Sequence, residues 1–162
     1  DRMDETITPI NEALRAKIQP LIDEAWAGPM IAVNGRLWDT RTLPGFAVLD
    51  KNGVIAGYLL FAFHDGECEI MVLESLRENS GIGTALTNAA KEIAKENGLH
   101  KLIVMTTNDN LHAIRFYQKR GFTLRALRPN MLETSRRLKS GIPLMSEDGI
   151  PLCDEIEFEM EI

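Results

Sequence analysis

The sequence predicts a mixed α/β fold in which a central, mostly antiparallel sheet is flanked by helices. The first half of the chain carries a helical apolar stripe and then short runs rich in β-branched and aromatic residues. The second half alternates strand-like and helix-like runs between residues 67 and 127. Residues 155–162 alternate acidic and apolar side chains, as a half-buried final strand does.

The first element predicted is a helix that begins at Thr8-Pro9. A hydroxyl residue suits the N-cap, and proline suits the first helical position. The apolar residues behind it recur at helical spacing: Ile10, Ala13, Leu14 and Ile18. We expect Pro20 to break or restart this helix, because proline lacks a backbone N–H. The apolar face then continues through Leu21, Ile22, Ala25 and Trp26.

Short strands follow the helical region. Residues 30–33 read as a strand that ends at the Asn34-Gly35 turn. Residues 45–49 and 54–63 flank the turn sequence Asp-Lys-Asn-Gly at 50–53, and therefore predict a hairpin.

Strands and helices alternate from residue 67 onward. We expect a strand at 67–73, a helix after Gly81-Ile82-Gly83, a strand at 101–106, a helix at 111–119 and a strand at 122–127.

The strand at 67–73 carries the acidic residues of later interest. Strict alternation places Glu67, Glu69 and Met71 on one face. The other face then carries Cys68, Ile70 and Val72. Further along, residues 132–138 read as a short basic helix.

Composition indicates one ordinary globular domain spanning residues 1–162. Hydrophobic residues make up 44% of the chain and charged residues 26%. The net charge of −6 disfavours nonspecific nucleic-acid binding. The longest apolar run, at 54–63, is too short to span a membrane. Cys68 and Cys153 form no CxxC motif and are expected to be reduced, which suits a cytoplasmic protein. No group of His, Cys, Asp or Glu residues has the spacing of metal ligands, so we expect no metal.

Gly81-Ile82-Gly83 predicts an anion site, because glycines admit a ligand close to the backbone at the start of a helix. The same pattern also occurs in plain tight turns. A P-loop lysine motif is absent, and Leu86 stands where a dinucleotide fingerprint would have its third glycine.

A second motif narrows the choice of ligand. Residues 110–122 read Asn-x-x-Ala-x-x-Phe-Tyr-x-Lys-x-Gly-Phe. Together with the glycine loop, this segment resembles the acetyl-CoA-binding core of the GCN5-related N-acetyltransferase (GNAT) family, over residues 45–127. The resemblance implies a GNAT-like acyl-CoA N-acyltransferase fold, with acceptor-site elements in 8–44 and 128–162. One position departs from the family loop: Glu78 stands where Arg or Gln is usual.

The resemblance also implies a set of cofactor-binding residues. Backbone groups of Met71, Val72 and Leu73 would bind the pantetheine arm as an added strand does. The pyrophosphate would meet N–H groups in the loop and first helical turn. The residues implied there are Asn79, Gly81, Gly83 and Thr84. Asn110 would bind pantetheine, Ala113 would leave space for it, and Phe116 would pack beside it. Helix capping and core packing remain alternatives for Asn110 and Phe116.

Two catalytic roles follow from the same resemblance. Tyr117 matches the tyrosine that protonates the departing thiolate, although a core aromatic is the alternative. A base must also take a proton from the acceptor amine. Glu69 is our choice, and the other candidates are Glu74, Glu67 and His64. We expect His112 to be an exposed helix residue.

The function implied is transfer of an acetyl group from acetyl-CoA to a primary amine by direct attack in a ternary complex. The acceptor is a small molecule or a peptide, and relatives often dimerise through the C-terminal strands. Candidate pocket residues are Trp26, Trp38 and the pair Arg136-Arg137, for which packing or solvation is the alternative. A non-catalytic acyl-CoA sensor and a nucleotide-binding α/β protein are the competing hypotheses.

Overall fold

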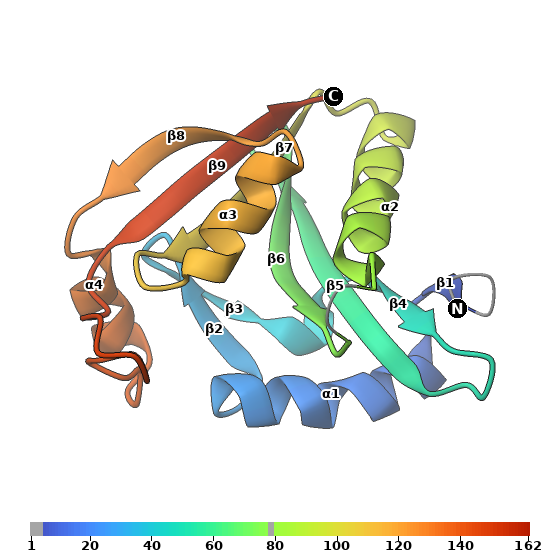
Figure 1. Cartoon of the computed structure of the whole chain (residues 1–162), viewed down its shortest axis with the longest axis horizontal. Coiled ribbons are helices and arrows are strands. Elements are labelled where there is room, and N and C mark those ends of the chain that lie inside the picture. Colours follow the sequence, from blue (N-terminus) through green and yellow to red (C-terminus); the bar gives the residue numbers. More distant parts are fainter. Residues whose placement is uncertain (1–4, 78–79) are drawn as a thin grey trace.

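The computed structural model describes residues 5–77 and 80–162 (Figure 1). Its main sheet has seven strands in the order β1-β4-β5-β6-β7-β9-β8, and all neighbours are antiparallel except β6 and β7. The strands are β1 (Thr6–Pro9), β4 (Gly45–Leu49), β5 (Ile55–His64), β6 (Glu67–Ser75), β7 (Lys101–Thr107), β8 (Thr123–Arg128) and β9 (Glu155–Glu161). The predicted mixed α/β fold, mostly antiparallel, is therefore confirmed.

A two-stranded hairpin and the helices complete the fold. The hairpin consists of β2 (Met30–Val33) and β3 (Arg36–Asp39). The helices are α1 (Glu12–Trp26), the short 3-10 helix η2 (Thr40–Thr42), α2 (Ile82–Glu96), α3 (Leu111–Lys119) and α4 (Met131–Leu138). Within the described part of the chain, no helix combines the length and apolarity that crossing a bilayer requires.

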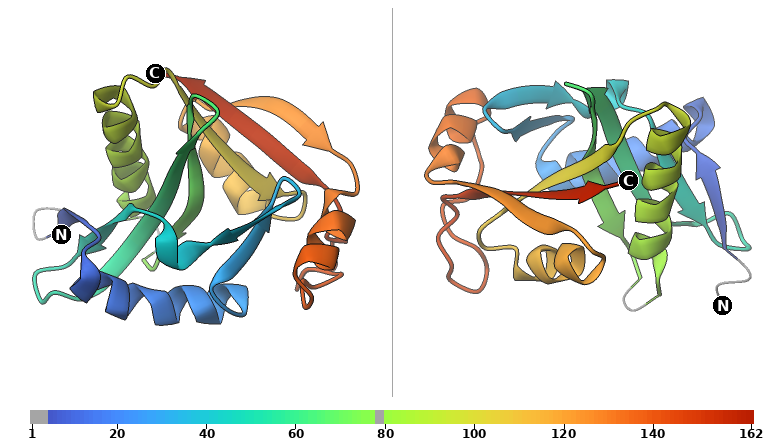
Figure 2. Two further views of the ribbon diagram at one scale, coloured as in Figure 1. Left: turned by 180° about the vertical axis from the view of Figure 1, so that it is seen from behind. Right: turned by 90° about the horizontal axis from the view of Figure 1, so that it is seen from above.

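The sheet separates two apolar cores. One core packs α2 and α3 against the first face, around Cys68, Ile70 and Tyr117. The second core packs α1 and the β2–β3 hairpin against the opposite face, around Ile18, Ile22 and Leu60. Figure 2 shows the two groups of elements on opposite sides of the sheet. We refer to the two faces of the sheet as the α2/α3 face and the α1 face, after the helices that cover them.

The N-terminal prediction was wrong at its first element. Thr8 and Pro9 end strand β1, in which Thr8 pairs with Ala47. An edge strand tolerates proline, because one side of its backbone needs no ladder hydrogen bond. Helix α1 starts later, where the Asn11 side chain accepts a hydrogen bond from the Leu14 N–H at 2.9 Å.

Pro20 does not break this helix, since α1 runs through it without interruption. A proline within a helix removes one backbone hydrogen bond. Apolar burial offsets the lost hydrogen bond, because Ile18 and Ile22, two residues before and after Pro20, are fully buried against the α1 face.

A β-bulge at Met71 changes the predicted faces of β6. Leu60 pairs with Val72 and Phe61 pairs with Ile70, so Met71 is the extra residue. Cys68 and Ile70 pack in the α2/α3 core, but both Met71 and Val72 pack in the α1 core. Strict alternation therefore placed Val72 on the wrong face.

The last strand is more deeply enclosed than its alternating pattern predicts. β9 lies between β7 and β8, so both of its edges are paired. Glu155 and Glu157 each retain only 4% of their accessible surface. Arg125 and Arg128 of β8 form ion pairs with Glu157 at 2.9 and 2.6 Å, which compensates for the burial of its charge.

Candidate active site

Strands β6 and β7 are paired over only a short stretch. Their register covers Cys68–Leu102, Glu69–Ile103 and Ile70–Val104, and pairing stops where the Met71 bulge begins. Figure 1 shows the two strands diverging beyond this point. Among the described residues, the second half of β6 therefore has no strand partner on its β7 side, which leaves its backbone groups there available to a ligand.

Two adjoining cavities lie on the α2/α3 face beside this divergence. The first, of about 540 Å³, is lined by the glycine loop and by residues of α3. The second, of about 290 Å³, extends from Leu73 to Tyr117. Both cavities are lined by Ser75, Gly83, His112 and Phe116, so they form one continuous groove.

The glycines of the loop allow helix α2 to start against the groove. Gly81 is the N-cap, with a φ of +76° and no side-chain capping hydrogen bond. The first N–H groups of α2 thus have no side-chain acceptor from the N-cap, and the helix dipole adds partial positive charge there. At Gly83, a Cβ atom would lie 3.1 Å from the Phe116 ring, so glycine permits this close approach of α2 and α3.

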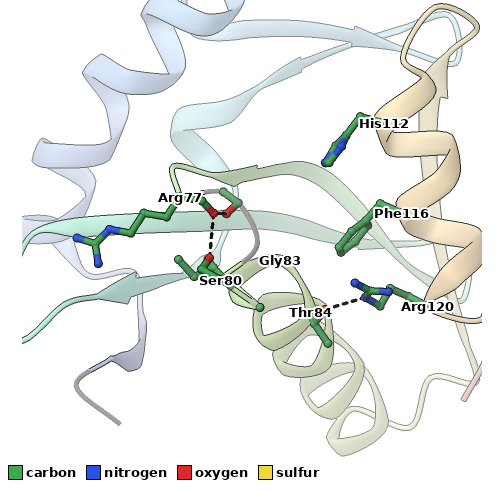
Figure 3. A pocket seen from close by; sticks show the side chains of 10 residues that line it. Arg77, Ser80, Gly83, Thr84, His112, Phe116 and Arg120 are labelled. Atoms are coloured by element: carbon green, nitrogen blue, oxygen red, sulfur yellow. Dashed lines mark hydrogen bonds between the residues drawn. The ribbon is translucent and has the colours of Figure 1, made fainter. Parts of the chain in front are cut away.

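An arginine that we did not predict lies at the loop. Arg120 lines the first cavity, and its Nε donates a hydrogen bond to the Thr84 hydroxyl at 2.7 Å (Figure 3). Its guanidinium also lies 4.7 Å from the centre of the Phe116 ring. Arg77, which lines the same cavity, is instead paired with Asp50 at 2.6 Å. The sequence offered one indication of this role: Arg120 follows Phe116 by four residues, which is about one helical turn, and directly precedes Gly121-Phe122.

Helix α3 brings the second motif to the groove. The Asn110 side chain caps this helix by accepting a hydrogen bond from the Ala113 N–H at 3.1 Å. This uses Oδ1 and leaves the Nδ2 donors as the groups that the amide could offer to a ligand. Ala113 also lines the second cavity. His112 is an exposed helix residue, as we expected, and it lines both cavities as well.

Tyr117 combines a buried ring with a place in the cavity lining. It is 6% exposed and contacts the rings of Phe116, Phe122 and Phe158. Burial, reinforced by the nearby charge of Glu74, raises the pKa of Tyr117 well above its ordinary value. The phenol therefore holds its proton at neutral pH. Glu74 lines the same cavity, and burial raises the pKa of its carboxyl group as well.

Glu69 lies on the other face of the sheet from Tyr117. Its side chain is almost fully buried, and Oε1 is 2.6 Å from Nε2 of His64. The other ring nitrogen of His64 lies 2.8 Å from a carboxylate oxygen of Asp65. Burial raises the pKa of Glu69, although His64 opposes the shift. Burial lowers the pKa of His64, but its bonds to Asp65 and Glu69 outweigh this effect and raise it.

A third cavity, of about 390 Å³, lies on the α1 face. Its walls come from α1, β2, α4 and the segment after α4, and it adjoins the groove at Asn110, which lines both. Trp26 is part of this lining. Trp38 lies beside His64 instead, with its ring centre 5.4 Å from the imidazole. Arg136 is engaged by the carbonyl groups of Ile142, Pro143 and Leu152, and Arg137 is exposed.

Neither cysteine is suited to act as a nucleophile. Burial raises the pKa of Cys68 to about 12, and the pKa of Cys153 is also raised. Both thiols are free of disulfides and remain protonated at neutral pH. Among residues 5–77 and 80–162, no three His, Cys, Asp or Glu side chains lie close enough together to hold a metal ion.

The comparisons with known proteins identify the family. The acetyltransferase (GNAT) family model matches residues 12–122. This chain belongs to the GNAT family. YdhI from Bacillus subtilis (strain 168) is 39% identical over 156 residues, which cover 96% of this chain and 98% of YdhI.

Solved GNAT structures share the fold over almost the whole chain. An IAA acetyltransferase from Bacillus cereus ATCC 14579 gives a TM-score of 0.73 at 23% identity, and covers 98% of this chain and 99% of its own. A GNAT acetyltransferase from Elizabethkingia anophelis with acetyl-CoA bound gives 0.69 at 23% identity, with the same coverage. GNAT enzymes use acetyl-CoA.

The groove brings most of the residues singled out by the GNAT resemblance to one place. Leu73, Gly81, Gly83, Thr84, Asn110, Ala113, Phe116 and Tyr117 line it. Met71 lines the third cavity instead, Val72 is buried, and Glu69 is on the opposite face from the groove. Asn79 and Glu78 lie outside the described residues.

Proposed function

We propose that this chain transfers the acetyl group of acetyl-CoA to a primary amine by direct attack in a ternary complex. The observation that carries the proposal is the continuous groove between the glycine loop and Tyr117, beside the unpaired half of β6. A helix start that suits a phosphate group, an unpaired strand edge and a buried phenol occur there together. Acetyl-CoA supplies the thioester carbonyl that the amine attacks.

The residues of the groove fit this cofactor. The N-terminus of α2 and Arg120 offer positive charge to the pyrophosphate. Backbone groups of Met71, Val72 and Leu73 lie where β6 has left β7, and can pair with the pantetheine amides. Gly83 keeps the groove open, because a side chain there would press on Phe116.

Tyr117 is proposed as the general acid. When the carbon–sulfur bond breaks, the phenol gives its proton to the departing thiolate sulfur. Its raised pKa keeps the proton in place until that moment. Burial of Cys68, with its raised pKa, favours direct attack over an acyl-cysteine route.

Glu69 is proposed as the general base. A raised carboxyl pKa brings a glutamate closer to the basicity that proton abstraction requires. Its Oε2 atom is buried and accepts no hydrogen bond from the described residues, so its lone pairs are not used by a donor there. Glu69 is two residues from Met71, which lines the third cavity. We propose that the proton passes from the amine to Glu69 through water, with His64 holding the carboxylate.

Calorimetric titration with acetyl-CoA tests the proposal, with ATP and NAD as controls. We expect acetyl-CoA to bind and both nucleotides to fail to compete. An amine panel monitored by thiol release then separates an enzyme from a non-catalytic acyl-CoA sensor. Binding without thiol release from any amine would favour the sensor. Absence of acetyl-CoA binding to the folded protein would refute both.

A further inference from the structure

The third cavity has an apolar body and two glutamates, Glu24 and Glu155, in its wall. Its apolar side chains come from both halves of the chain and include Trp26, Ile31, Met105, Leu132 and Pro143. Glu155 of β9 lines the same cavity. The volume of about 390 Å³ is in the range of small-molecule sites.

Glu155 has an unsatisfied oxygen. The residue is 4% exposed, and its Oε2 accepts a hydrogen bond from the Asn34 N–H at 3.1 Å. Its Oε1 is buried and accepts no hydrogen bond from the described residues. The cation paired with Oε1, Arg128 Nη1, is 3.9 Å away, and the Nη2 of that arginine is bound to Glu157 at 2.6 Å. Unsatisfied buried acceptors are rare in native proteins, so one on a residue that lines a cavity points to a donor that the cavity receives.

The charges around Glu155 favour a cation. Glu157 and Glu69 lie on the same face as Glu155. Burial raises the pKa of Glu155 and of Glu69, and the negative charge of Glu157 adds to both shifts. Lys139 also lines the cavity, but its ammonium donates to the carbonyl groups of Met30, at 2.6 Å, and of Trp26. Arg136 likewise donates to backbone carbonyls, so both cations direct their hydrogen bonds at the protein backbone. An acceptor carboxylate in the cavity would also meet the negative charge of Glu155.

The reacting amine is an unsuitable partner for this carboxylate. A fixed negative charge raises the pKa of a neighbouring ammonium group, so the amine stays protonated. A protonated amine cannot attack the thioester. Glu155 is better suited to a positive charge that the acceptor retains throughout the reaction. The cavity adjoins the cofactor groove at Asn110, so the reacting amine would lie at that end.

We propose that the acceptor is a primary amine with a second positive charge, separated from the first by an apolar segment, and that Glu155 binds the second charge. This inference rests on the proposed function, since it names the acceptor class of the same site. Glu155 would thus be a specificity-determining residue. An apolar segment would pack against the side chains that line the cavity.

Three matched acceptors test the inference on the wild-type protein: hexane-1,6-diamine, hexylamine and 6-aminohexanoate. We expect kcat/KM for the diamine to exceed that for hexylamine by about 10-fold or more, because a charge-assisted hydrogen bond is gained. We expect 6-aminohexanoate to be the poorest acceptor. A diamine no better than hexylamine would overturn the inference.

The variant Glu155→Gln tests the residue itself. We expect the diamine-to-hexylamine ratio to fall toward one, with the loss appearing in KM for the diamine. Glu159→Gln is the matched control, because Glu159 lies on the same strand and face but not in the cavity lining. We expect it to keep the wild-type ratio. An unchanged ratio in Glu155→Gln would also overturn the inference.

Direct binding separates this inference from the proposed function. Calorimetric titration of hexane-1,6-diamine into the wild-type protein, with and without CoA, needs no acetyl transfer. If no amine is acetylated, the proposed function fails, while stronger binding of the diamine than of hexylamine still supports Glu155 as a cation site. Equal binding of the two would refute the site. If Glu155→Gln does not fold, the wild-type comparison decides.

Discussion

Arg120 at the end of α3 donates a hydrogen bond to the Thr84 hydroxyl in the first turn of α2, with the two atoms 2.7 Å apart. This contact joins the two helices that form the wall of the groove where we propose that acetyl-CoA binds. It holds a guanidinium beside a helix N-terminus, where a phosphate group is favoured by both charge and hydrogen bonding.

We therefore expect Arg120→Gln to weaken acetyl-CoA binding by about 10-fold, because a charge-assisted contact is lost. The salt dependence of binding should also become shallower. Calorimetry at two salt concentrations measures both effects. Arg115→Gln, an exposed position on the same helix, is the control. Equal losses in the two variants would mean that only overall charge matters.

Removal of the Tyr117 hydroxyl should affect turnover and not cofactor binding. For Tyr117→Phe we expect kcat to fall by about 100-fold, because a general acid contributes on that scale. The ring packing is kept, so the acetyl-CoA Kd should change little. Tyr58→Phe makes the same change at a buried tyrosine that lines none of the three cavities. Normal turnover in Tyr117→Phe would remove this residue from the chemistry.

Glu69→Gln should lower kcat by about 100-fold and abolish the rise of the rate with pH that comes from the ionisation of a carboxyl base. A pH–rate profile with saturating acetyl-CoA measures this. Glu67→Gln is matched, since Glu67 lies on the same strand and face but pairs with Arg125. If both variants retain the wild-type profile, Glu69 is not the base.

The His64–Glu69 pair should make stability depend on pH. The pKa of His64 is raised in the folded protein above its ordinary value of 6.5. The stability that His64 contributes to the folded state is therefore complete below about pH 6.5, and it is lost as the pH rises through the raised pKa. We expect the difference in urea midpoint between wild type and His64→Gln to shrink from about pH 6 to pH 9. A difference that grows with pH would contradict this assignment.

Gly57 sets how closely α2 approaches the sheet. A Cβ atom there would lie 2.5 Å from Cγ2 of Ile82 and 2.9 Å from the carbonyl oxygen of Glu74. We expect Gly57→Ala to lower the free energy of unfolding by about 1–3 kcal/mol, as overpacking does. Urea denaturation measures the change. A gain in stability would show that the helix can move away without cost.

Local sequence was sufficient for many elements. The predicted helix at 111–119 and strand at 30–33 have the bounds that the structure gives, because capping residues and turn residues act within a few positions of themselves. The mixed sheet and the family were also evident from the order of elements and the two motifs. These signals depend on residues that are close in sequence.

Contacts between distant segments decided the rest. Thr8-Pro9 is typical of a helix start, yet pairing with β4 makes it a strand. The Met71 bulge, which moves Val72 to the α1 face, arises from the register with β5. The position of β9 between β7 and β8 buries Glu155 and makes it part of a cavity wall. Arg120 meets Thr84 across 36 residues of sequence. Periodicity shows which side chains share a face of one element, whereas pairing partners and cavities depend on how separate elements pack together.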